Sequence, residues 1–225
     1  SLNAMIRELQ PQALINDRGP DAGDYSTPER HLPAGLEFER PTEACQSMGR
    51  ESWGYREDED YFSDRFLMGS IDAILAMGGN YLLNVGPKPN GELPEVCVQG
   101  LARIGEWYAR VREAFADTVA CSSMLDTSEG HRRRYDELFM TRRGNTFYVH
   151  APHGLSADGM VVSAFRIGPE SATLLNDGRE LSWAVDTLPW RWQELPCLRL
   201  RGLPANELAG EPVVVKLVFG DDVAD

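Results

Sequence analysis

Apolar residues recur at helical spacing in three segments of the first half of the chain. This pattern predicts helices over residues 2–9, 64–77 and 94–115. Ser63 is the expected N-cap of the second helix, and Gly78-Gly79 supplies its stop signal. The third helix begins on a proline, which fits the first turn of a helix. The side chains expected to face inward are Phe66, Leu67, Ile71, Ile74 and Leu75 in the second helix and Val98, Leu101, Ile104, Trp107 and Tyr108 in the third.

Short apolar runs lie between these helices. They predict buried strands over residues 13–16, 42–46 and 80–85. Strands that alternate with helices form parallel βα units, so the first half of the chain has the pattern of an α/β barrel. The segment 17–41 is rich in Gly, Pro, Asp and Glu and is expected to be a long irregular loop. Loops of that length inside compact domains are usually functional or mobile.

Helical periodicity ends near Thr118, and short alternating segments separated by turn residues follow it. Arg143-Gly144-Asn145 lies between two such segments and predicts a hairpin. The strands expected in this half cover residues 139–142, 146–150, 160–165, 172–175, 181–185, 198–201 and 213–219. Turn signals at this spacing are typical of an antiparallel β-sandwich. The sequence therefore predicts two domains: the C-terminal part of a (β/α)8-like barrel over residues 1–117 and a β-sandwich over residues 118–225.

The charge balance bears on the class of partner. The chain has a net charge of −13 at pH 7, whereas nucleic-acid binding needs a cationic surface, so no nucleic-acid partner is expected. One basic cluster, Arg132-Arg133-Arg134 with Arg142-Arg143 nearby, is flanked by acidic residues and is expected to be a solvated surface. The longest apolar runs have about six residues, and a membrane-spanning helix needs roughly 20. No membrane partner is expected either.

The cysteines and histidines do not predict a metal site. The cysteines are far apart in the sequence, match no zinc-binding spacing and are expected to be buried free thiols. His150 and His153 lie three residues apart, but Pro152 between them excludes a regular helical ligand pair. We interpret this segment as the exit from a strand.

Asn16-Asp17-Arg18 is the first of three polar segments that could carry chemistry. It follows a predicted buried strand, and catalytic groups of α/β barrels collect at the carboxyl ends of such strands. Arg18 would be a fixed cation with a rigid fork of donors, suited to holding hydroxyls or orienting a carboxylate. The alternative is an Asp17–Arg18 pair that only tethers the following loop.

Glu29 belongs to the second segment, residues 23–30, and follows a proline that stiffens its approach. A glycosidase needs a protonated carboxyl beside the leaving oxygen and a second carboxylate at the anomeric carbon. Glu29 could be the first of these groups. The alternative is that residues 27–29 start a short surface helix, with Glu29 stabilising its N-terminus.

Trp53 is the centre of the third segment, residues 51–55. A tryptophan beside glycine in a polar loop, away from any helical stripe, is unfavourable to leave exposed. Sugars have apolar faces, so an aromatic platform at a loop tip is a reasonable binding element. The alternative is a tryptophan that packs beneath the loop and holds it in place.

Taken together and in this order, these segments resemble the α-L-fucosidase family of glycoside hydrolases. The motifs that carry the resemblance are Glu8-Leu9-Gln10-Pro11, Leu14-Ile15-Asn16-Asp17-Arg18, Gly23-Asp24-Tyr25-Ser26-Thr27-Pro28-Glu29, Glu43-Ala44-Cys45, Ser52-Trp53-Gly54-Tyr55, Gly78-Gly79-Asn80-Tyr81-Leu82-Leu83-Asn84-Val85-Gly86-Pro87 and Asn90-Gly91. The resemblance is strong over residues 5–117 and looser in the strand-rich half. At Asn90 the family often has an aspartate, which is a mild departure in a loop.

The resemblance implies a barrel-like catalytic domain followed by a β-sandwich, and hydrolysis of terminal α-L-fucosides or fucosylated glycans without a cofactor. In the retaining mechanism an aspartate attacks the anomeric carbon while an acid protonates the leaving oxygen, and the acid then serves as base for water. On this match Glu29 corresponds to the acid/base. Arg18 corresponds to a sugar-site arginine and Trp53 to an aromatic that packs near the fucose methyl.

The resemblance also exposes a departure. Family members place the nucleophile in a Trp-x-x-Asp-Gly-like segment before the part that matches Asn16-Asp17-Arg18, and no such segment precedes it here. A barrel of this kind closes with about eight strands, whereas residues 1–117 offer about three. We therefore expect the C-terminal piece of a fucosidase that is inactive alone, or a chain that receives the missing part from another chain in an oligomer. The alternative is a truncated, non-catalytic sugar-binding or structural remnant.

Overall fold

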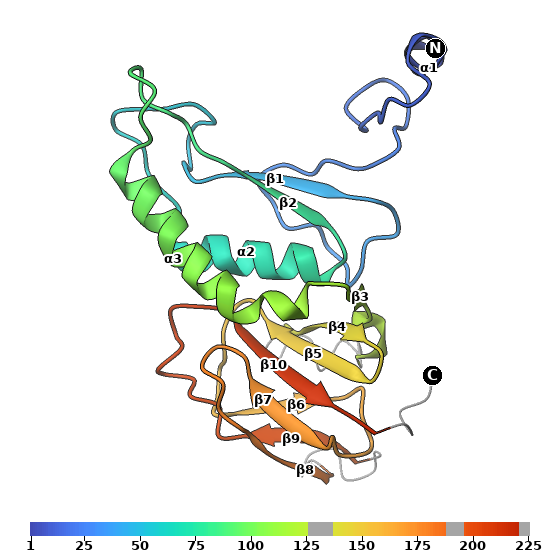
Figure 1. Ribbon diagram of the computed structural model, residues 1–225, viewed down its shortest axis with the longest axis vertical. Coiled ribbons are helices and arrows are strands. Elements are labelled where there is room, and N and C mark those ends of the chain that lie inside the picture. Colours follow the sequence, from blue (N-terminus) through green and yellow to red (C-terminus); the bar gives the residue numbers. More distant parts are fainter. Residues whose placement is uncertain (126–136, 188–195, 221–225) are drawn as a thin grey trace.

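Helices dominate the first part of the chain and strands the second (Figure 1). The structure is a computed structural model that describes residues 1–125, 137–187 and 196–220. The elements of the first part are α1 (Leu2–Leu9), β1 (Glu43–Ser47), α2 (Asp64–Ala76), β2 (Asn80–Asn84), α3 (Glu95–Val111) and the 3-10 helix η1 (Arg112–Ala114). Those of the second part are β3 (Val119–Ala120), the 3-10 helix η2 (Ser122–Met124), β4 (Phe139–Arg143), β5 (Thr146–Ala151), β6 (Gly159–Val162), β7 (Ser171–Leu174), β8 (Ser182–Asp186), β9 (Cys197–Arg201) and β10 (Val213–Val218).

β1, α2 and β2 form the predicted βαβ unit. Ser63 caps α2, because its Oγ accepts a hydrogen bond from the N–H of Phe66 at 3.3 Å. The helix ends before Gly78, which has a φ of +85° and donates its N–H to the Leu75 carbonyl at 3.0 Å. The chain then enters β2, which pairs in parallel with β1. The glycine pair therefore stops the helix as the sequence predicts.

The strand predicted over residues 13–16 is wrong. Within the described residues this segment has one β-pairing, an isolated parallel bridge between Asn16 and Tyr25, and Leu14 is 80% exposed. β2 is also less buried than predicted: Leu82 is 43% exposed, while Leu83 on the other face packs against the α2 cluster. A parallel strand is buried only where both faces of its sheet are covered. In the described part of the chain α2 covers the face of this sheet that carries Leu83, and the face that carries Leu82 stays open.

The inward face of α3 differs from the predicted one. Ile104 and Trp107 are buried as expected, but Val98 and Tyr108 are 45% and 39% exposed. On α2, Phe66 is likewise 45% exposed. The correct stripe of α3 follows the alternating spacing of three and four residues that defines one helix face. Its members are Cys97, Gly100, Ile104, Trp107 and Val111.

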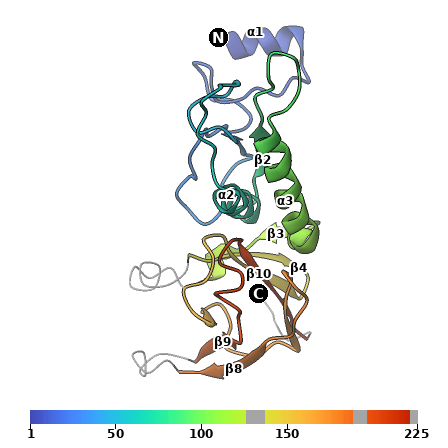
Figure 2. The same ribbon diagram turned by 90° about the vertical axis from the view of Figure 1, so that its left-hand side faces the viewer.

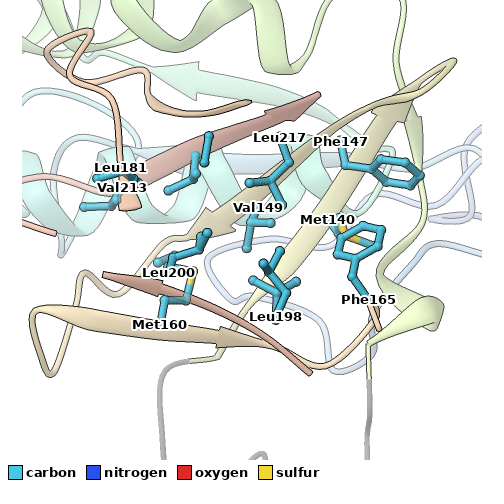
Figure 3. Packing of buried hydrophobic residues seen from close by; sticks show 14 of the residues in the cluster. Met140, Phe147, Val149, Met160, Phe165, Leu181, Leu198, Leu200, Val213 and Leu217 are labelled. Carbon is cyan, nitrogen blue, oxygen red and sulfur yellow. The ribbon is translucent and has the colours of Figure 1, made fainter. Parts of the chain in front are cut away.

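The second part is the predicted antiparallel β-sandwich. One sheet has the strand order β3-β4-β5-β10-β7 and the other the order β6-β9-β8. The predicted hairpin joins β4 to β5 through Gly144, whose φ is +58°. Inward side chains of the two sheets face one another in the core, as Val149 and Leu217 do with Leu198 and Leu200 (Figure 3).

The helices α2 and α3 pack on the outer face of the five-stranded sheet (Figure 2). Tyr148 of β5 and Val214 of β10 are fully buried in the same apolar cluster as Trp107. The indole Nε1 of Trp107 also donates to the carbonyl of Pro212 at 3.2 Å. At Gly69 of α2, an added Cβ would lie 2.5 Å from the Pro152 carbonyl oxygen, so only glycine permits this approach.

A buried chain of polar groups crosses this junction. Asp72 of α2 and His150 of β5 are fully buried, and their Oδ1 and Nδ1 atoms lie 2.9 Å apart. His150 Nε2 lies 3.1 Å from the hydroxyl of Thr141 on β4, and that hydroxyl donates to the Ala114 carbonyl at 2.7 Å. Because the hydroxyl has one proton, it accepts from His150 Nε2–H. A second proton lies between Asp72 Oδ1 and His150 Nδ1 and makes that contact a hydrogen bond. Burial raises the pKa of Asp72, and His150 opposes this shift.

Three expectations about the chain as a whole have different outcomes. The division into domains at residues 1–117 and 118–225 stays a prediction, because the junction cluster contains residues from both sides. Arg132-Arg133-Arg134 lies outside the described residues. In the part of the chain that the structure describes, no helix is both long and apolar enough to cross a bilayer.

We predict that Asp72→Ala lowers the free energy of unfolding of this chain by about 3–5 kcal/mol, since it leaves the His150 ring buried without its partner. Urea denaturation monitored by tryptophan fluorescence measures the change. The exposed Glu106→Ala on α3 is the control and should stay within about 0.5 kcal/mol of the parent. A loss from Asp72→Ala below about 1 kcal/mol would place the pair among ordinary surface ion pairs and contradict the assignment.

Candidate functional site

A tight loop holds the Asn16-Asp17-Arg18 segment. The Asn16 Oδ1 accepts from the Arg18 N–H at 3.2 Å, and Asp24 Oδ2 accepts from the Ile15 N–H at 2.8 Å. That hydrogen bond from Ile15 is the main reason why the pKa of Asp24 is lowered. At Gly23 an added Cβ would lie 2.1 Å from the Asn16 carbonyl oxygen, so a side chain there would prevent closure. The segment is therefore fixed by loop contacts in place of the predicted strand.

Four side chains form a continuous set of contacts across this loop. The guanidinium Nη1 of Arg18 forms an ion pair with the Glu29 carboxylate. Arg18 Nε donates to the hydroxyl of Thr27 at 2.9 Å, and that hydroxyl donates to Asp17 Oδ1 at 2.9 Å. The hydrogen bond from the Thr27 side chain is the largest cause of the lowered pKa of Asp17. Arg18 thus pairs with Glu29, and Asp17 and Arg18 also tether the following loop through Thr27, so the tether considered from the sequence remains open.

The segment that carries Glu29 runs beside β1 in an extended conformation. The Pro28 carbonyl accepts from the Cys45 N–H at 2.9 Å, and the Cys45 carbonyl accepts from the Arg30 N–H at 2.9 Å. Glu29 itself forms a parallel bridge with Cys45. The alternative of a short surface helix starting at residues 27–29 is therefore wrong. The backbone of β1 holds Glu29 in place.

The side chain of Cys45 lies on the face of β1 that meets Arg18. Its Sγ lies 3.8 Å from Arg18 Nη2. Burial raises the pKa of the Cys45 thiol, Arg18 opposes this shift, and the carboxylates of Glu43 and Glu29 reinforce it. The other cysteines are buried, and burial raises the pKa of Cys121 to about 12.

Trp53 joins the site through Arg30. The Arg30 guanidinium carbon lies 4.5 Å from the centroid of the Trp53 ring, and Arg30 Nη1 donates to the Arg50 carbonyl at 2.5 Å. The Trp53 backbone is held from β2, because Asn84 Nδ2 donates to its carbonyl at 2.6 Å. Trp53 as a whole residue is 36% exposed. It is held in place by its neighbours and still presents part of its surface to solvent.

The structure brings two of the three predicted site residues, Arg18 and Glu29, into direct contact, whereas Trp53 contacts Arg30, the residue that follows Glu29 in the chain. Sequence reasoning missed the contacts of Thr27 and Arg30. Thr27 is an ordinary loop residue in sequence, and the positive φ of Arg30, +58°, has no signature in a non-glycine side chain. The groups in direct contact are the carboxyl of Glu29 and the guanidinium of Arg18, which can bind the hydroxyl groups of a neutral ligand.

A cleft of about 420 Å³ lies near this site on the opposite face of β1. Side chains alternate between the faces of a strand, so Gln46 lines the cleft whereas Cys45 faces Arg18. The remaining lining residues come from α2, the loop after Glu29 and the exit of β5: Arg30, His31, Leu32, Ser63, Arg65, Phe66, Gly69, Ser70, Pro152 and His153. The cleft is thus separated from the Arg18–Glu29 pair by the strand itself.

Within 1–125, 137–187 and 196–220, no three His, Cys, Asp or Glu side chains gather as they would around a metal ion. His150 is buried at the end of β5 and bound to Asp72, whereas His153 is exposed beyond the strand. The two histidines are therefore not a ligand pair in this arrangement.

Comparison with known proteins gives a consistent likeness. A family model described as Alpha-L-fucosidase matches residues 1–113. Plasma alpha-L-fucosidase of Homo sapiens is 31% identical over 197 residues, which are 82% of this chain and 39% of the human protein. The structure of alpha-L-fucosidase isoenzyme 1 from Paenibacillus thiaminolyticus has a TM-score of 0.72 at 27% identity, covering 98% of this chain and 53% of the other. The Thermotoga maritima alpha-fucosidase in complex with fucose shares the fold, with a TM-score of 0.66 at 22% identity over 96% of this chain and 47% of its own.

These relatives are longer than this chain. The chain spans about two fifths of the length of the human plasma protein and about half of the Paenibacillus structure.

We predict that Arg18→Gln slows the alkylation of Cys45 by iodoacetamide, because the thiolate is the reacting form and Arg18 lowers the pKa of this thiol. Glu43→Gln should accelerate the same reaction, because Glu43 raises that pKa. Mass spectrometry of the Cys45 peptide after timed labelling of the folded chain measures both rates. Opposite signs of the two effects support the geometry, and equal rates in parent and Arg18→Gln contradict it.

Proposed function

The chain belongs to the α-L-fucosidase family, and we propose that it supplies the acid/base side of a retaining active site that hydrolyses terminal α-L-fucosides. The observation that carries this proposal is the pairing of Glu29 with Arg18 on a loop held against β1. A carboxyl group in such a position can meet the glycosidic oxygen of a bound sugar. The fucose complex of the Thermotoga maritima relative supports the choice of sugar.

In the proposed mechanism Glu29 acts twice. In the first step it gives its proton to the glycosidic oxygen as the bond from that oxygen to the anomeric carbon breaks, while an aspartate forms a bond to the same carbon. In the second step Glu29 takes a proton from water, whose oxygen displaces the aspartate. Retaining enzymes hold the two carboxyl groups roughly 5–5.5 Å apart. We propose that the aspartate comes from polypeptide outside these 225 residues.

Arg18 and Trp53 have binding roles in this proposal. The guanidinium of Arg18 donates to a sugar hydroxyl or to the carboxyl of Glu29, and its fork of donors suits either acceptor. The partly exposed ring of Trp53 offers an apolar surface to the C6 methyl group of fucose. The stacked Arg30 guanidinium fixes the plane of that ring.

We further propose that β1, α2, β2 and α3 are the last units of a (β/α)8-like barrel. The parallel βαβ unit and the exposed Leu82 on the open face of β2 support this view. An uncovered apolar face on a parallel sheet calls for further strands and helices. The strands that close the barrel would be those that bring the aspartate toward Glu29. On this view the isolated chain does not turn over substrate.

We predict that Glu29→Gln, made in the complete polypeptide that contains this chain, lowers kcat/KM by about 10²–10⁴ for an α-L-fucoside with an alkyl or sugar leaving group. The effect on 4-nitrophenyl α-L-fucoside should be much smaller, because nitrophenolate leaves without a proton. The matched control is Glu39→Gln, which changes an exposed carboxylate of the same loop. Its kcat/KM should equal that of the parent on both substrates.

Two outcomes would contradict the proposal in different ways. Equal kcat/KM for parent and Glu29→Gln on the alkyl fucoside would remove Glu29 from the acid/base role. Saturable fucose binding by the complete polypeptide without any turnover would favour the alternative of a non-catalytic sugar-binding protein.

We also predict that Trp53→Ala reduces the preference for α-L-fucoside over α-L-galactoside by about 10-fold or more, because the two sugars differ only by a hydroxyl at C6 and the ring covers the methyl group. The ratio of the two kcat/KM values measures the preference. Trp183→Ala, which removes an exposed tryptophan of β8, is the control and should leave the ratio unchanged. An unchanged ratio in Trp53→Ala would remove Trp53 from the sugar site.

A further inference from the structure

The position of Arg18 needs an explanation beyond its ion pair. The side chains of Arg18 and Glu29 are 47% and 40% exposed, and exposed ion pairs between flexible side chains contribute little to order. A long arginine side chain also loses rotamer entropy when it is held in one geometry. Other contacts must therefore keep the guanidinium beside Glu29.

Those contacts come from Thr27 and have a fixed direction. The Thr27 hydroxyl has one proton, which it donates to Asp17 Oδ1 at 2.9 Å. Its oxygen is then free to accept from Arg18 Nε at 2.9 Å. Nε is the donor closest to the side-chain stem, so fixing it sets the plane of the whole guanidinium. The Nη1 end is thereby directed to Glu29 and the Nη2 end to Cys45.

Asp17 holds Thr27 in turn. Its Oδ1 accepts both the side-chain hydroxyl and the backbone N–H of Thr27, at 2.9 and 3.0 Å. These hydrogen bonds lower the pKa of Asp17, so the carboxylate is the form that the loop stabilises. A carboxylate only accepts, so Thr27 has to point its proton toward Asp17 and its lone pair toward Arg18. The charge of the Asp17 carboxylate therefore sets the direction of the hydrogen bonds from Arg18 to Thr27 and from Thr27 to Asp17.

We propose that Asp17 and Thr27 are positioning residues for the acid/base step, acting on Glu29 through Arg18. This inference rests on the proposed role of Glu29. In the proposed function Arg18 binds a sugar hydroxyl and Glu29 protonates the leaving oxygen. The proposal predicts that disturbing Thr27 or Asp17 resembles a mild form of the Glu29 defect. A residue that only stabilises the loop would instead affect all substrates alike.

The test is Thr27→Val in the complete polypeptide. This change keeps the shape of the side chain and removes the two hydrogen bonds of the hydroxyl, to Arg18 and to Asp17. We expect the loss of kcat/KM to be about 10-fold or more larger for a methyl α-L-fucoside than for 4-nitrophenyl α-L-fucoside, because both substrates lose contacts to a displaced Arg18 but only the methyl leaving group needs the proton of Glu29. Thr27→Ser keeps the hydroxyl and should restore most of the loss. Asp17→Ala, which removes the acceptor of both Thr27 hydrogen bonds, should show the same leaving-group dependence as Thr27→Val.

The controls separate this inference from the proposed function. Thr173→Val on β7 makes the same chemical change in the sandwich and should match the parent on both substrates. If Glu29→Gln shows the leaving-group dependence and Thr27→Val does not, the positioning role is overturned while the acid/base role stands. Equal losses on both substrates in Thr27→Val would show a purely structural role. If Glu29→Gln shows no such dependence, the proposed function fails first.

Discussion

The buried contact between Asp72 and His150 is the constraint on which the rest of the structure depends. It joins α2 to β5 at a point where no water competes for either group, and it continues through Thr141 to the carbonyl that ends η1. Directional polar contacts of this kind admit one relative placement, whereas apolar packing tolerates small shifts. Because α2 connects β1 to β2 in the chain and packs against β2, this contact also fixes the sheet that carries the candidate site.

The candidate site shows the same principle on a smaller scale and near solvent. Glu29 takes its backbone position from Cys45 on β1, and its side chain meets Arg18, which is oriented from Asp17. Few apolar contacts are involved. Hydrogen bonds to backbone groups supply the rigidity that the long loop could not supply by packing. A loop poor in secondary structure can therefore present a well-placed carboxyl group.

The sequence predicted most elements because their signals are local. Ser63 caps its helix, and Gly144 turns its hairpin whatever lies around them. Burial was predicted less well, because it depends on neighbours distant in sequence: Leu14 and Val98 looked like core residues and are exposed. In the site, Arg18 and Glu29 could be selected by residue type and family likeness. Thr27 could not, because its role depends on which atoms it meets after folding.

Gly69 links the packing of α2 on the sandwich to the position of the candidate site. The absence of a side chain lets α2 touch the carbonyl of Pro152 at the edge of the sandwich, and the next turn of the same helix carries Asp72. A methyl group at this position would push the helix outward, and the displacement would pass to β1 and then to the loop of Glu29. Selection on catalysis would therefore act on a residue that never meets the ligand. In evolutionary terms, the sandwich half of the chain and the loop of Glu29 are under joint constraint through one missing carbon atom.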